Sequence, residues 1–436
     1  MKLSYSIARN CINKEIWDEI HKDYSFYKLP YFIGHDEEVP SFKHYYMTKD
    51  CFLIQEDNFY DLLHKMEILN NQIIPKTVSY LLEYDKQNLI DYFKFSEKIA
   101  KVIEYDYKNK KQLNSYYWRY DLLIDTENNV KIIEFNSETP AWFWETLLST
   151  TCIYNNVYDE QLNNTKDFNS LFEERVWNSL ESILKTIKQW ETLWILYWSS
   201  DWEIHEYEED YINALHICAF FIRRWINAHM IFANDLTLSD EWLFHNSTKI
   251  DHIFTFYPLE WIFEDDTEWL FFDAYLQWKF SIINTTLNLI SQNKRFWSYV
   301  YEKLFYTQDV FTFEEKEIIQ ELLPKSSISD FFWSISKAIL FREWIWIYFD
   351  EQHKKEATWD VVYQEKIQQQ EFQLNTFYSN KKFENYYWTW EWWKQKWYIT
   401  LWIYFWKDQA LWVYTRFSEK QVSDDSCYFL PVFLKK

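Results

Sequence analysis

Apolar residues in the first quarter of the chain recur with the spacing of amphipathic helices. In residues 57–72 (DNFYDLLHKMEILNNQ) and 89–107 (LIDYFKFSEKIAKVIEYDY), apolar side chains lie three and four positions apart, which places them on one face of a helix. Residues 165–190 show the same pattern. These patterns predict a helical N-terminal region over residues 1–115 and a further helix near the middle of the chain.

After residue 115 the pattern changes to short β-rich runs that alternate with helical ones. The first is a strand–turn–strand unit, in which RYDLLID and VKIIEFN flank the polar turn residues 126–129. A helical run covers residues 208–224, and the further β-rich runs are at 192–198, 227–233, 249–257, 337–350, 360–365, 396–406 and 410–417. The alternation predicts an α/β layer in the middle of the chain and a mixed α/β fold class.

The glycine content of the chain is far below that of an ordinary globular protein. The 436 residues include one glycine and 27 tryptophans, whereas glycine at its usual frequency would supply about 30 residues. Tight turns and helix C-termini need positive φ angles, which glycine adopts at the least steric cost. Tryptophan stands where turns are expected, as in YYWTWEWWKQKWY at 386–398. We hypothesise that UGA codons, which encode glycine in the natural protein, are read here as tryptophan. The alternative is a true tryptophan-rich binding protein, and UGG codons at all these positions would establish it.

Charge and cysteine content limit the expected classes of partner and the expected cellular compartment. The chain has 67 acidic and 45 basic residues and a net charge of −22, which argues against nucleic acid and anionic membrane surfaces as partners. The five cysteines lack CxxC spacing, which is typical of reduced thiols in a cytosolic protein. The N-terminus lacks the apolar core of a signal peptide, and no apolar run reaches the roughly 18–20 residues that span a bilayer. We therefore expect a cytoplasmic protein.

Polar residues recur on one face of the strand–turn–strand unit. Arg119 and Asp121 are two positions apart on the first strand, and Glu134 and Asn136 repeat this spacing on the second. Pairing of the strands would gather all four side chains. Two carboxylates and an amide oxygen suit Mg²⁺, and an adjacent arginine can bind phosphate. A solvated polar face opposite an apolar one explains the spacing equally well.

With tryptophan read as glycine, seven blocks of the chain resemble motifs of the glutathionylspermidine synthase family, which are ATP-grasp amide ligases. GRYDLLID…VKIIEFNSETP resembles the family pattern GRfD…hEyNaDTP. The blocks that follow in the family's order are EEDYINALHICAFFIRRG, FYPLEW, SQNKRF, SKAILFREGIGIYFD, VVYQE and YITLGIYFGKDQALGVYTRF. FYPLEW matches with Trp261 kept as tryptophan, so its codon is expected to be UGG. The resemblance covers about residues 115–434 and implies an ATP-grasp fold with a pre-ATP-grasp-like α/β subdomain.

The resemblance implies a role for each matching residue. Asp121, Glu134 and Asn136 match the family's Mg²⁺ ligands, and Arg119 matches the arginine that faces the transferred phosphate. The residues that match ATP contacts are Lys294 and Lys337, at the phosphates, and Gln364 and Glu365, near adenine and ribose. The residues that match contacts to the acid and amine substrates are Thr139, Glu209, Asp210 and Arg416. Without the resemblance, the lysines are typical of solvated side chains and the Gln–Glu pair of an exposed strand end.

The chain departs from the family pattern mainly on the acceptor side. Thr139 and Ala141 replace conserved serines, and Ala338 replaces a proline. The acid that follows the family's arginine at 416 is missing, and the polar run at 366–396 is longer than in the family. The fused amidase domain with its cysteine nucleophile is absent from the motifs. The metal and ATP motifs are therefore kept while the identity of the substrates is left open.

The resemblance implies an ATP-grasp ligase that uses ATP and Mg²⁺ to join a carboxylate, such as glutathione or a peptide, to an amine such as a polyamine. We expect three parts, namely a helical region at 1–115, the metal-binding strand pair with an α/β subdomain at 116–260, and the nucleotide-binding region at 261–436. The alternatives are a non-catalytic relative that binds nucleotide or peptide, and a carbohydrate-binding protein if the tryptophans are real. The oligomeric state is open.

Overall fold

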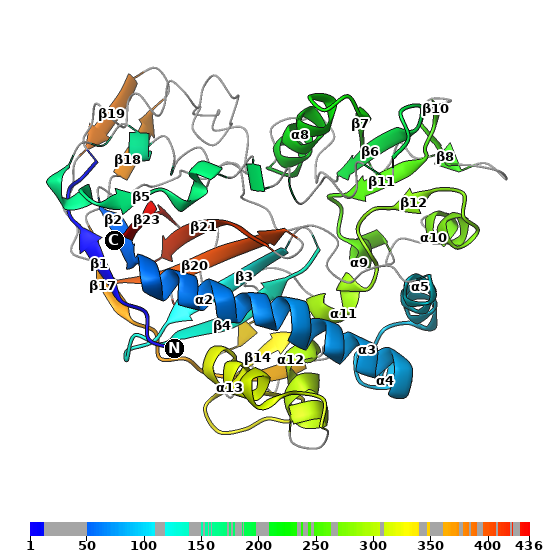
Figure 1. Ribbon diagram of the computed structural model, residues 1–436, viewed down its shortest axis with the longest axis horizontal. Helices are drawn as coiled ribbons and strands as arrows, with labels where there is room; N and C mark the ends of the chain where they lie inside the picture. Colours follow the sequence, from blue (N-terminus) through cyan, green and yellow to red (C-terminus); the bar gives the residue numbers. More distant parts are fainter. Residues whose placement is uncertain are drawn as a thin grey trace.

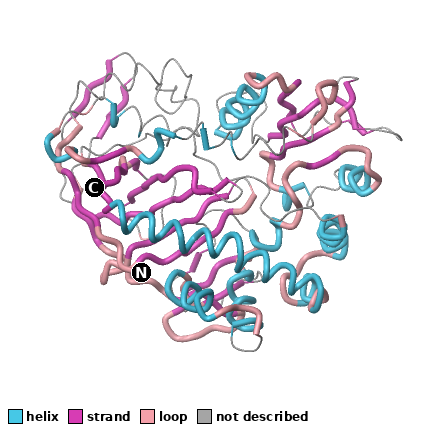
Figure 2. The backbone as a smooth tube through the Cα atoms, in the orientation of Figure 1, coloured by secondary structure: helices cyan, strands magenta, loops and turns pink. Residues whose placement is uncertain are grey.

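The computed structural model is drawn in Figures 1 and 2. It describes residues 1–12, 50–109, 118–138, 150, 153–155, 157, 159–171, 174–175, 178, 185, 187–197, 209–232, 237–238, 243–245, 248–262, 269–305, 309–339, 347–348, 361–374, 378–382, 385–389, 396–406, 409–418, 421 and 428–436. Among these residues, no helix has the length and apolar character needed to cross a bilayer.

An antiparallel sheet forms the centre of the molecule (Figure 1). Strands β3 (Trp118–Ile124) and β4 (Val130–Asn136) confirm the predicted strand–turn–strand unit. The other strands come from the C-terminal third and are β17 (Glu371–Gln373), β20 (Lys396–Trp406), β21 (Gln409–Ser418) and β22 (Tyr428–Phe429). The order is β22-β21-β20-β3-β4, with β17 paired to β20. The sheet thus joins residues that the sequence assigns to the second and third parts of the chain, and the three-part division stays a prediction.

The two faces of the central sheet are buried in different hydrophobic layers. The helices that cover one face are α2 (Glu56–Ile68), a π-helical turn (Leu69–Ile73) and α3 (Ile74–Tyr84), seen across the sheet in Figure 1. Ile403 and Phe405 of β20 belong to the layer that contains these helices. Trp402 and Tyr404, which alternate with them, belong to the other layer. This period of two is that of a strand buried on both sides.

A second, parallel sheet has the order β12-β11-β6-β7. Its strands are β6 (Thr192–Tyr197), β7 (Asn227–Phe232), β11 (His252–Thr255) and β12 (Ser281–Ile282). Helix α8 (Glu209–Ile222) connects β6 to β7 and contacts both. These elements confirm the predicted α/β layer.

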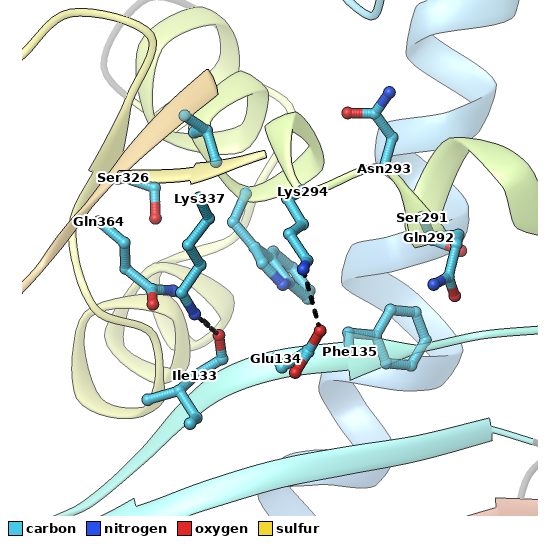
Figure 3. A pocket seen from close by; sticks show the side chains of 12 residues that line it. Ile133, Glu134, Phe135, Ser291, Gln292, Asn293, Lys294, Ser326, Lys337 and Gln364 are labelled. Atoms are coloured by element: carbon cyan, nitrogen blue, oxygen red, sulfur yellow. Dashed lines mark hydrogen bonds and ion pairs between the residues drawn. The ribbon is translucent and has the colours of Figure 1, made fainter. Parts of the chain in front are cut away.

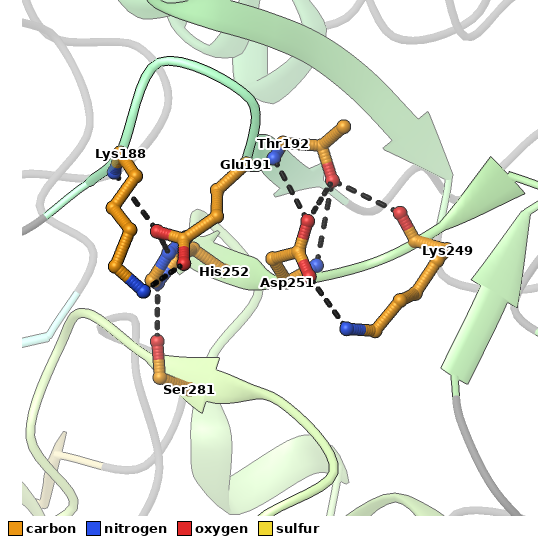
Figure 4. A network of polar contacts seen from close by, with 7 residues as sticks. All are labelled: Lys188, Glu191, Thr192, Lys249, Asp251, His252 and Ser281. Atoms are coloured by element: carbon orange, nitrogen blue, oxygen red, sulfur yellow. Dashed lines mark hydrogen bonds and ion pairs between the residues drawn. The ribbon is translucent and has the colours of Figure 1, made fainter.

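A polar network fixes the starting ends of the parallel strands (Figure 4). His252 Nε2 lies 3.0 Å from a carboxylate oxygen of Glu191, and His252 Nδ1 lies 2.6 Å from Ser281 Oγ. Burial raises the pKa of Glu191, but hydrogen bonds from Lys188 and His252 outweigh it and lower that pKa to about 2. The network therefore ties the loop before β6 to β11 and β12.

A third sheet, the β13–β16 sheet, lies beside β4 with the order β13-β16-β14-β15. Its strands are β13 (Ser326–Ser327), β14 (Ser334–Ala338), β15 (Ile347–Tyr348) and β16 (Val361–Glu365). The helices next to it in the chain are α11 (Asn288–Gln292), α12 (Arg295–Tyr299) and α13 (Phe313–Leu322). Helix α13 begins with a capping box, in which Thr312 and Glu315 each accept a hydrogen bond from the other's backbone N–H. Helices α11 and α13 both contact β4.

The fourth sheet joins the two ends of the chain. Its strands, in sheet order, are β1 (Tyr5–Ala8), β2 (Cys51–Gln55), β23 (Val432–Lys435) and β5 (Thr165–Lys166). The predicted helical N-terminal region therefore also contains two strands. Both strands are short, and β2 pairs in parallel with β23 at the other end of the chain, so this pairing is invisible to a local pattern.

The remaining elements, apart from the twelve-residue helix α5, are short. They are α4 (Asn88–Asp91), α5 (Glu97–Lys108), α9 (Leu259–Ile262), α10 (Trp269–Leu276), single helical turns at Glu160–Leu162, Phe168–Leu171 and Val300–Phe305, and strands β8 (Thr237–Leu238), β9 (Leu243–His245), β10 (Thr248–Lys249), β18 (Tyr378–Lys382) and β19 (Asn385–Thr389). The helix predicted at 89–107 is broken, because Lys94 has a φ of 62° and the Ser96 hydroxyl accepts from Ile99 N–H to start a new helix. The continuous helix predicted at 165–190 is wrong at its ends, because Thr165–Lys166 form strand β5, Phe168–Leu171 form a single helical turn and residues 189–190 form a turn. Residues 172–173, 176–177, 179–184 and 186 of this stretch lie outside the described residues.

Among the residues that the structure describes, three tryptophans have left-handed backbone conformations. The φ angles of Trp225, Trp278 and Trp333 are 65°, 62° and 65°. After α8, the Trp225 N–H bonds to Ile222 C=O and the next N–H bonds to Phe221 C=O, which is the Schellman motif that normally ends in glycine. Trp278 ends α10 with the same pair of bonds. Trp333 is the third residue of a tight turn closed by Ser334 N–H and Phe331 C=O, a position that favours glycine or asparagine when φ is positive.

Candidate functional site

A pocket lies at the edge of the central sheet, between β4 and the β13–β16 sheet (Figure 3). Strand β4 ends the central sheet, so one of its edges is available to face other elements. The polar side chains that line the pocket are those of Glu134, Ser291, Gln292, Asn293, Lys294, Ser326, Lys337 and Gln364. They come from five stretches of the chain that are separated in sequence.

A β-bulge in β4 places Ile133 in the lining of this pocket. The β3–β4 register passes from Asp121 opposite Glu134 to Leu122 opposite Ile132, so Ile133 faces no residue of β3. Its carbonyl oxygen accepts hydrogen bonds from Lys337 Nζ at 2.8 Å and from Gln364 Nε2 at 3.2 Å. The bulge therefore links β4 directly to β14 and β16.

Glu134 brings a negative charge to the two lysines of the pocket. Lys294 Nζ lies 3.3 Å from Glu134 Oε1, and both side chains are mostly buried (Figure 3). Burial alone would raise the pKa of Glu134, but the positive charges of Lys294, Lys337 and Arg119 lower it. The carboxylate is therefore ionised at neutral pH and available as an anionic ligand.

Lys337 is a buried cation on β14. Its side chain enters the pocket from the strand and is 5% exposed. Burial lowers the pKa of Lys337 to about 8, since the attraction of Glu134 only partly offsets burial and the repulsion of Lys294. An amine with this pKa changes charge close to neutral pH.

A second polar cluster lies on the face of the central sheet beside the pocket. Arg119 donates two hydrogen bonds to Asp121, from Nε at 2.6 Å and from Nη2 at 3.0 Å. Asn136 is the cross-strand partner of Arg119, and its amide donates to Asp121 Oδ1 at 3.4 Å. Burial raises the pKa of Asp121, although Arg119 acts against it. Asp121 and Glu134 are cross-strand partners, so the cluster and the pocket are adjacent.

Arg416 reaches the same face from β21. It is buried, and its guanidinium carbon lies 4.4 Å from the centre of the Trp402 ring. Arg119 contacts the same indole at 3.9 Å. The tertiary structure thus brings the two predicted arginines to one aromatic side chain.

The sequence profile described as glutathionylspermidine synthase preATP-grasp matches residues 24–435. The chain belongs to the glutathionylspermidine synthase family. Among solved structures it is similar to a glutathione synthetase-like effector from Globodera pallida in its apo form, at 11% identity and a TM-score of 0.62 over 98% of this chain and 99% of that chain. A putative gamma-glutamylcysteine synthetase from Methylobacillus flagellatus KT aligns at 11% identity and a TM-score of 0.40, over 83% and 86% of the two chains. No curated protein matches the chain significantly.

The family match and the shared fold of the effector confirm the mixed α/β, ATP-grasp-type fold expected from the motifs. Of the residues that resemble glutathionylspermidine synthase positions, the pocket contains Glu134, Lys294, Lys337 and Gln364, and the sheet face carries Arg119, Asp121, Asn136 and Arg416. Glu365 is exposed and accepts from Lys325 N–H at 3.2 Å, away from the pocket lining. The binding and catalytic roles of all these residues stay predictions.

Three predicted positions fall partly or wholly outside the described residues. Thr139 lies outside them. Glu209 and Asp210 begin α8, but their side chains are outside the described part. Nothing in the structure therefore bears on the predicted acceptor contacts of these residues.

Two groups at the site were missed by the sequence patterns. The carbonyl of Ile133 belongs to an apolar residue, and no side-chain motif signals a bulge. Gln292 is buried and lines the pocket, where its Oε1 accepts from Ser137 N–H at 2.8 Å. It lies within the SQNKRF block, where a polar residue two positions before Lys294 was the available signal.

The donor atoms fit Mg²⁺ by chemical type. Asp121 and Glu134 supply carboxylates and Asn136 an amide oxygen, which are the hard ligands that this ion prefers. Among the described residues, no three His, Cys, Asp or Glu side chains gather as a metal site, so any such site depends on the amide and on waters or phosphate oxygens. Both carboxylates are paired with cations, Asp121 with Arg119 and Glu134 with Lys294.

If Lys337 has its predicted role at the nucleotide phosphates, the affinity for nucleotide is expected to fall above about pH 8. Lys337 is protonated below its pKa of about 8 and neutral above it, and a neutral amine does not attract phosphate. The affinity for ADP with Mg²⁺ should be level near neutral pH and drop by up to about tenfold per unit above pH 8. Titration calorimetry from neutral pH to about pH 9.5 measures this. Lys337→Arg keeps its charge and should remove the decline, whereas a decline that survives in this variant would contradict the assignment to Lys337.

Proposed function

We propose that the protein is an ATP-dependent carboxylate–amine ligase that forms an amide through an acyl phosphate. The observation that carries the proposal is the meeting of buried Lys337, largely buried Lys294 and Glu134 in one pocket, beside the Arg119–Asp121 pair. A pocket with clustered buried cations suits a polyphosphate, and the neighbouring arginine suits the group to which phosphate is transferred. Membership of the glutathionylspermidine synthase family supports the same reaction class.

In the proposed reaction, the γ-phosphoryl group of ATP passes to the substrate carboxylate and ADP leaves. The amine nitrogen then attacks the acyl carbon and releases phosphate. Lys294 and Lys337 hold the nucleotide phosphates, and Arg119 offsets the negative charge that develops on the transferring group. Asp121, Glu134 and Asn136 would hold Mg²⁺, which supplies further positive charge to the phosphoryl oxygens.

The proposed substrates are an acid such as glutathione or a short peptide and an amine such as a polyamine. Arg416 on the sheet face is suited to a carboxylate, and the net charge of −22 is compatible with a cationic amine. Cys11, Cys51 and Cys218 are buried free thiols, which supports a reducing, cytoplasmic location.

We also propose that most tryptophans of the printed sequence are glycines in the natural protein, encoded by UGA. Support comes from Trp225, Trp278 and Trp333, which occupy two helix C-termini and a tight turn with positive φ. A bulky side chain in this conformation is unusual, whereas glycine is the common residue. Peptide masses of the natural protein measure the residue at each position directly, and tryptophan at these three would disprove the proposal.

A non-catalytic relative that binds nucleotide is the second candidate. In the printed sequence, the Trp402 indole contacts both Arg119 and Arg416. The indole therefore covers guanidinium surface that a substrate needs. ADP release separates the two candidates.

ADP release should require both an acid and an amine. Protein made with glycine at the UGA positions is given ATP and Mg²⁺ together with thiol peptides or amino acids, and with or without polyamines. We expect one acid–amine pair to release ADP and phosphate in equal amounts, with no release from Lys337→Met protein. If no pair releases ADP while ADP itself binds, the ligase is excluded and the non-catalytic relative remains.

A further inference from the structure

Three side chains at the starting edge of the parallel sheet form a hydrogen-bonded chain of serine, histidine and glutamate (Figure 4). His252 Nδ1 lies 2.6 Å from Ser281 Oγ, and His252 Nε2 lies 3.0 Å from a carboxylate oxygen of Glu191. None of the three lines the pocket between β4 and the β13–β16 sheet. A hydroxyl that is hydrogen-bonded to a base, with the base oriented by a third group, is the arrangement that activates a serine as a nucleophile.

The backbone of the parallel sheet fixes this chain of side chains. His252 and Ser281 are partners on the neighbouring strands β11 and β12, and the Ser281 N–H donates to the carbonyl of Asp251. Glu191 directly precedes β6. The backbone N–H and the Nζ of Lys188 donate to its two carboxylate oxygens at 2.9 and 3.0 Å. Strand pairing and a local turn therefore hold the nucleophile, the base and the acid in place.

The direction of proton donation follows from the charge of Glu191. Burial acts to raise the pKa of Glu191, but hydrogen bonds from Lys188 and His252 hold it at about 2, so the carboxylate is ionised and can only accept. The neutral imidazole therefore carries its proton on Nε2 and leaves Nδ1 as an acceptor. The Ser281 hydroxyl donates to Nδ1, which is the base that can remove its proton.

The reacting pair lies partly at the surface. The His252 and Glu191 side chains are each 17% exposed, and Ser281 is also partly exposed. At such a site, water can solvate the oxyanion that forms when a hydroxyl attacks a carbonyl group. Activated esters and thioesters, whose leaving groups depart readily as anions, are therefore the acyl donors that fit the site, whereas amides need a stronger catalyst.

We propose that Ser281, His252 and Glu191 form a reactive site, separate from the pocket, at which the Ser281 oxygen takes the acyl group of an activated ester or thioester. In this step His252 Nδ1 takes the Ser281 proton while Oγ forms a bond to the acyl carbon. The bond from that carbon to the leaving oxygen or sulfur breaks, and the alkoxide or thiolate departs with the electron pair. The product is an acyl-serine. This site does not depend on the proposed ligase function, because none of its residues lines the pocket.

Acetylation by p-nitrophenyl acetate tests the proposal. Protein prepared as for the ADP-release assay is treated with the ester, and mass spectrometry locates the acetyl group and follows its rate of appearance. We expect acetylation of Ser281. The rate should fall at least about 100-fold in His252→Gln, which keeps a hydrogen-bonding side chain but has no base. It should fall about 10- to 100-fold in Glu191→Gln, because a hydrogen bond to a charged group is lost.

Ser170 is the matched control within the same protein. It is exposed, and its hydroxyl donates to the carbonyl of Asp167 rather than to an imidazole. It should be acetylated at least about 100-fold more slowly than Ser281, since it lacks a general base, and at the same rate in every variant. Equal rates at Ser170 and Ser281, or an unchanged Ser281 rate in His252→Gln, would overturn the proposal, because Ser281 would then react as an ordinary hydroxyl.

Ser281→Ala separates this site from the proposed ligase. The variant should lose the acetylation at position 281 and keep ADP release unchanged. If the unchanged protein is acetylated at Ser281 but releases no ADP, the ligase fails and the serine site stands. Circular dichroism reports the folding of each variant. Where a variant fails to fold, the unchanged protein decides, because absence of acetyl from its Ser281 overturns the proposal.

Discussion

Asp121→Asn is expected to reduce ADP release by at least about 100-fold, the range found when one preorganised electrostatic group is removed from an active site. The Asp121 carboxylate accepts both hydrogen bonds of the Arg119 guanidinium and faces Glu134 across the strand pair. An amide has the same shape but no charge, so it cannot balance Arg119 and is a weaker ligand for Mg²⁺. The rate of ADP release with a productive acid–amine pair measures the loss.

Asparagine is preferred to alanine at this position because the site is buried. Removing the side chain would leave Arg119 as an unpaired buried charge, which destabilises proteins by about 3–5 kcal/mol and would obscure the effect on activity. Asp125→Asn is the matched control. Asp125 is an acid of the same hairpin whose oxygens accept from the backbone N–H groups of Glu127 and Asn129, so its change should affect stability and leave ADP release intact. An unchanged rate in Asp121→Asn would refute the assignment of the metal and phosphate site.

In protein made with the tryptophans of the printed sequence, replacing Trp225, Trp278 and Trp333 by glycine should raise the free energy of unfolding by about 3–6 kcal/mol. A non-glycine residue in the left-handed region costs about 1–2 kcal/mol, and effects at separate sites add. The gain at Trp278 should be the smallest of the three, because its ring contacts Tyr105 at 5.3 Å. Against a total stability of about 5–15 kcal/mol, the combined change is large. Urea unfolding followed by circular dichroism measures it.

Two controls test whether the gain in stability comes from relief of backbone strain. Alanine at the same three positions also removes the indole but keeps Cβ, so it should give little of the gain. Trp190→Gly removes an exposed tryptophan from a turn without positive φ, and should not stabilise the protein. If alanine stabilises as much as glycine does, relief of backbone strain is not the cause, and this support for glycine at UGA codons is lost.

The β3–β4 hairpin could be predicted from sequence because the pattern that specifies it lies within one short stretch of the chain. Two alternating runs flank a short polar turn, so β3 and β4 pair with little loop entropy, and the period of two puts Arg119, Asp121, Glu134 and Asn136 on one face. The helix α8 and the parallel strands were equally visible, since their side-chain patterns repeat within one element. The short strands β1 and β2 were missed because four or five residues carry little periodicity and one of their partners is β23, at the other end of the chain.

The sequence by itself determined the fold class, the hairpin and the residue types of the site, because side-chain periodicity and motif spacing act over a few residues. Only the tertiary structure decided that the Ile133 bulge meets Lys337 and Gln364, and that β20 inserts between β21 and β3. That insertion brings the Trp402 ring against Arg119 and Arg416. These contacts join residues up to about 300 positions apart, and they are selected by burial and hydrogen bonding of the whole chain, which no local pattern encodes.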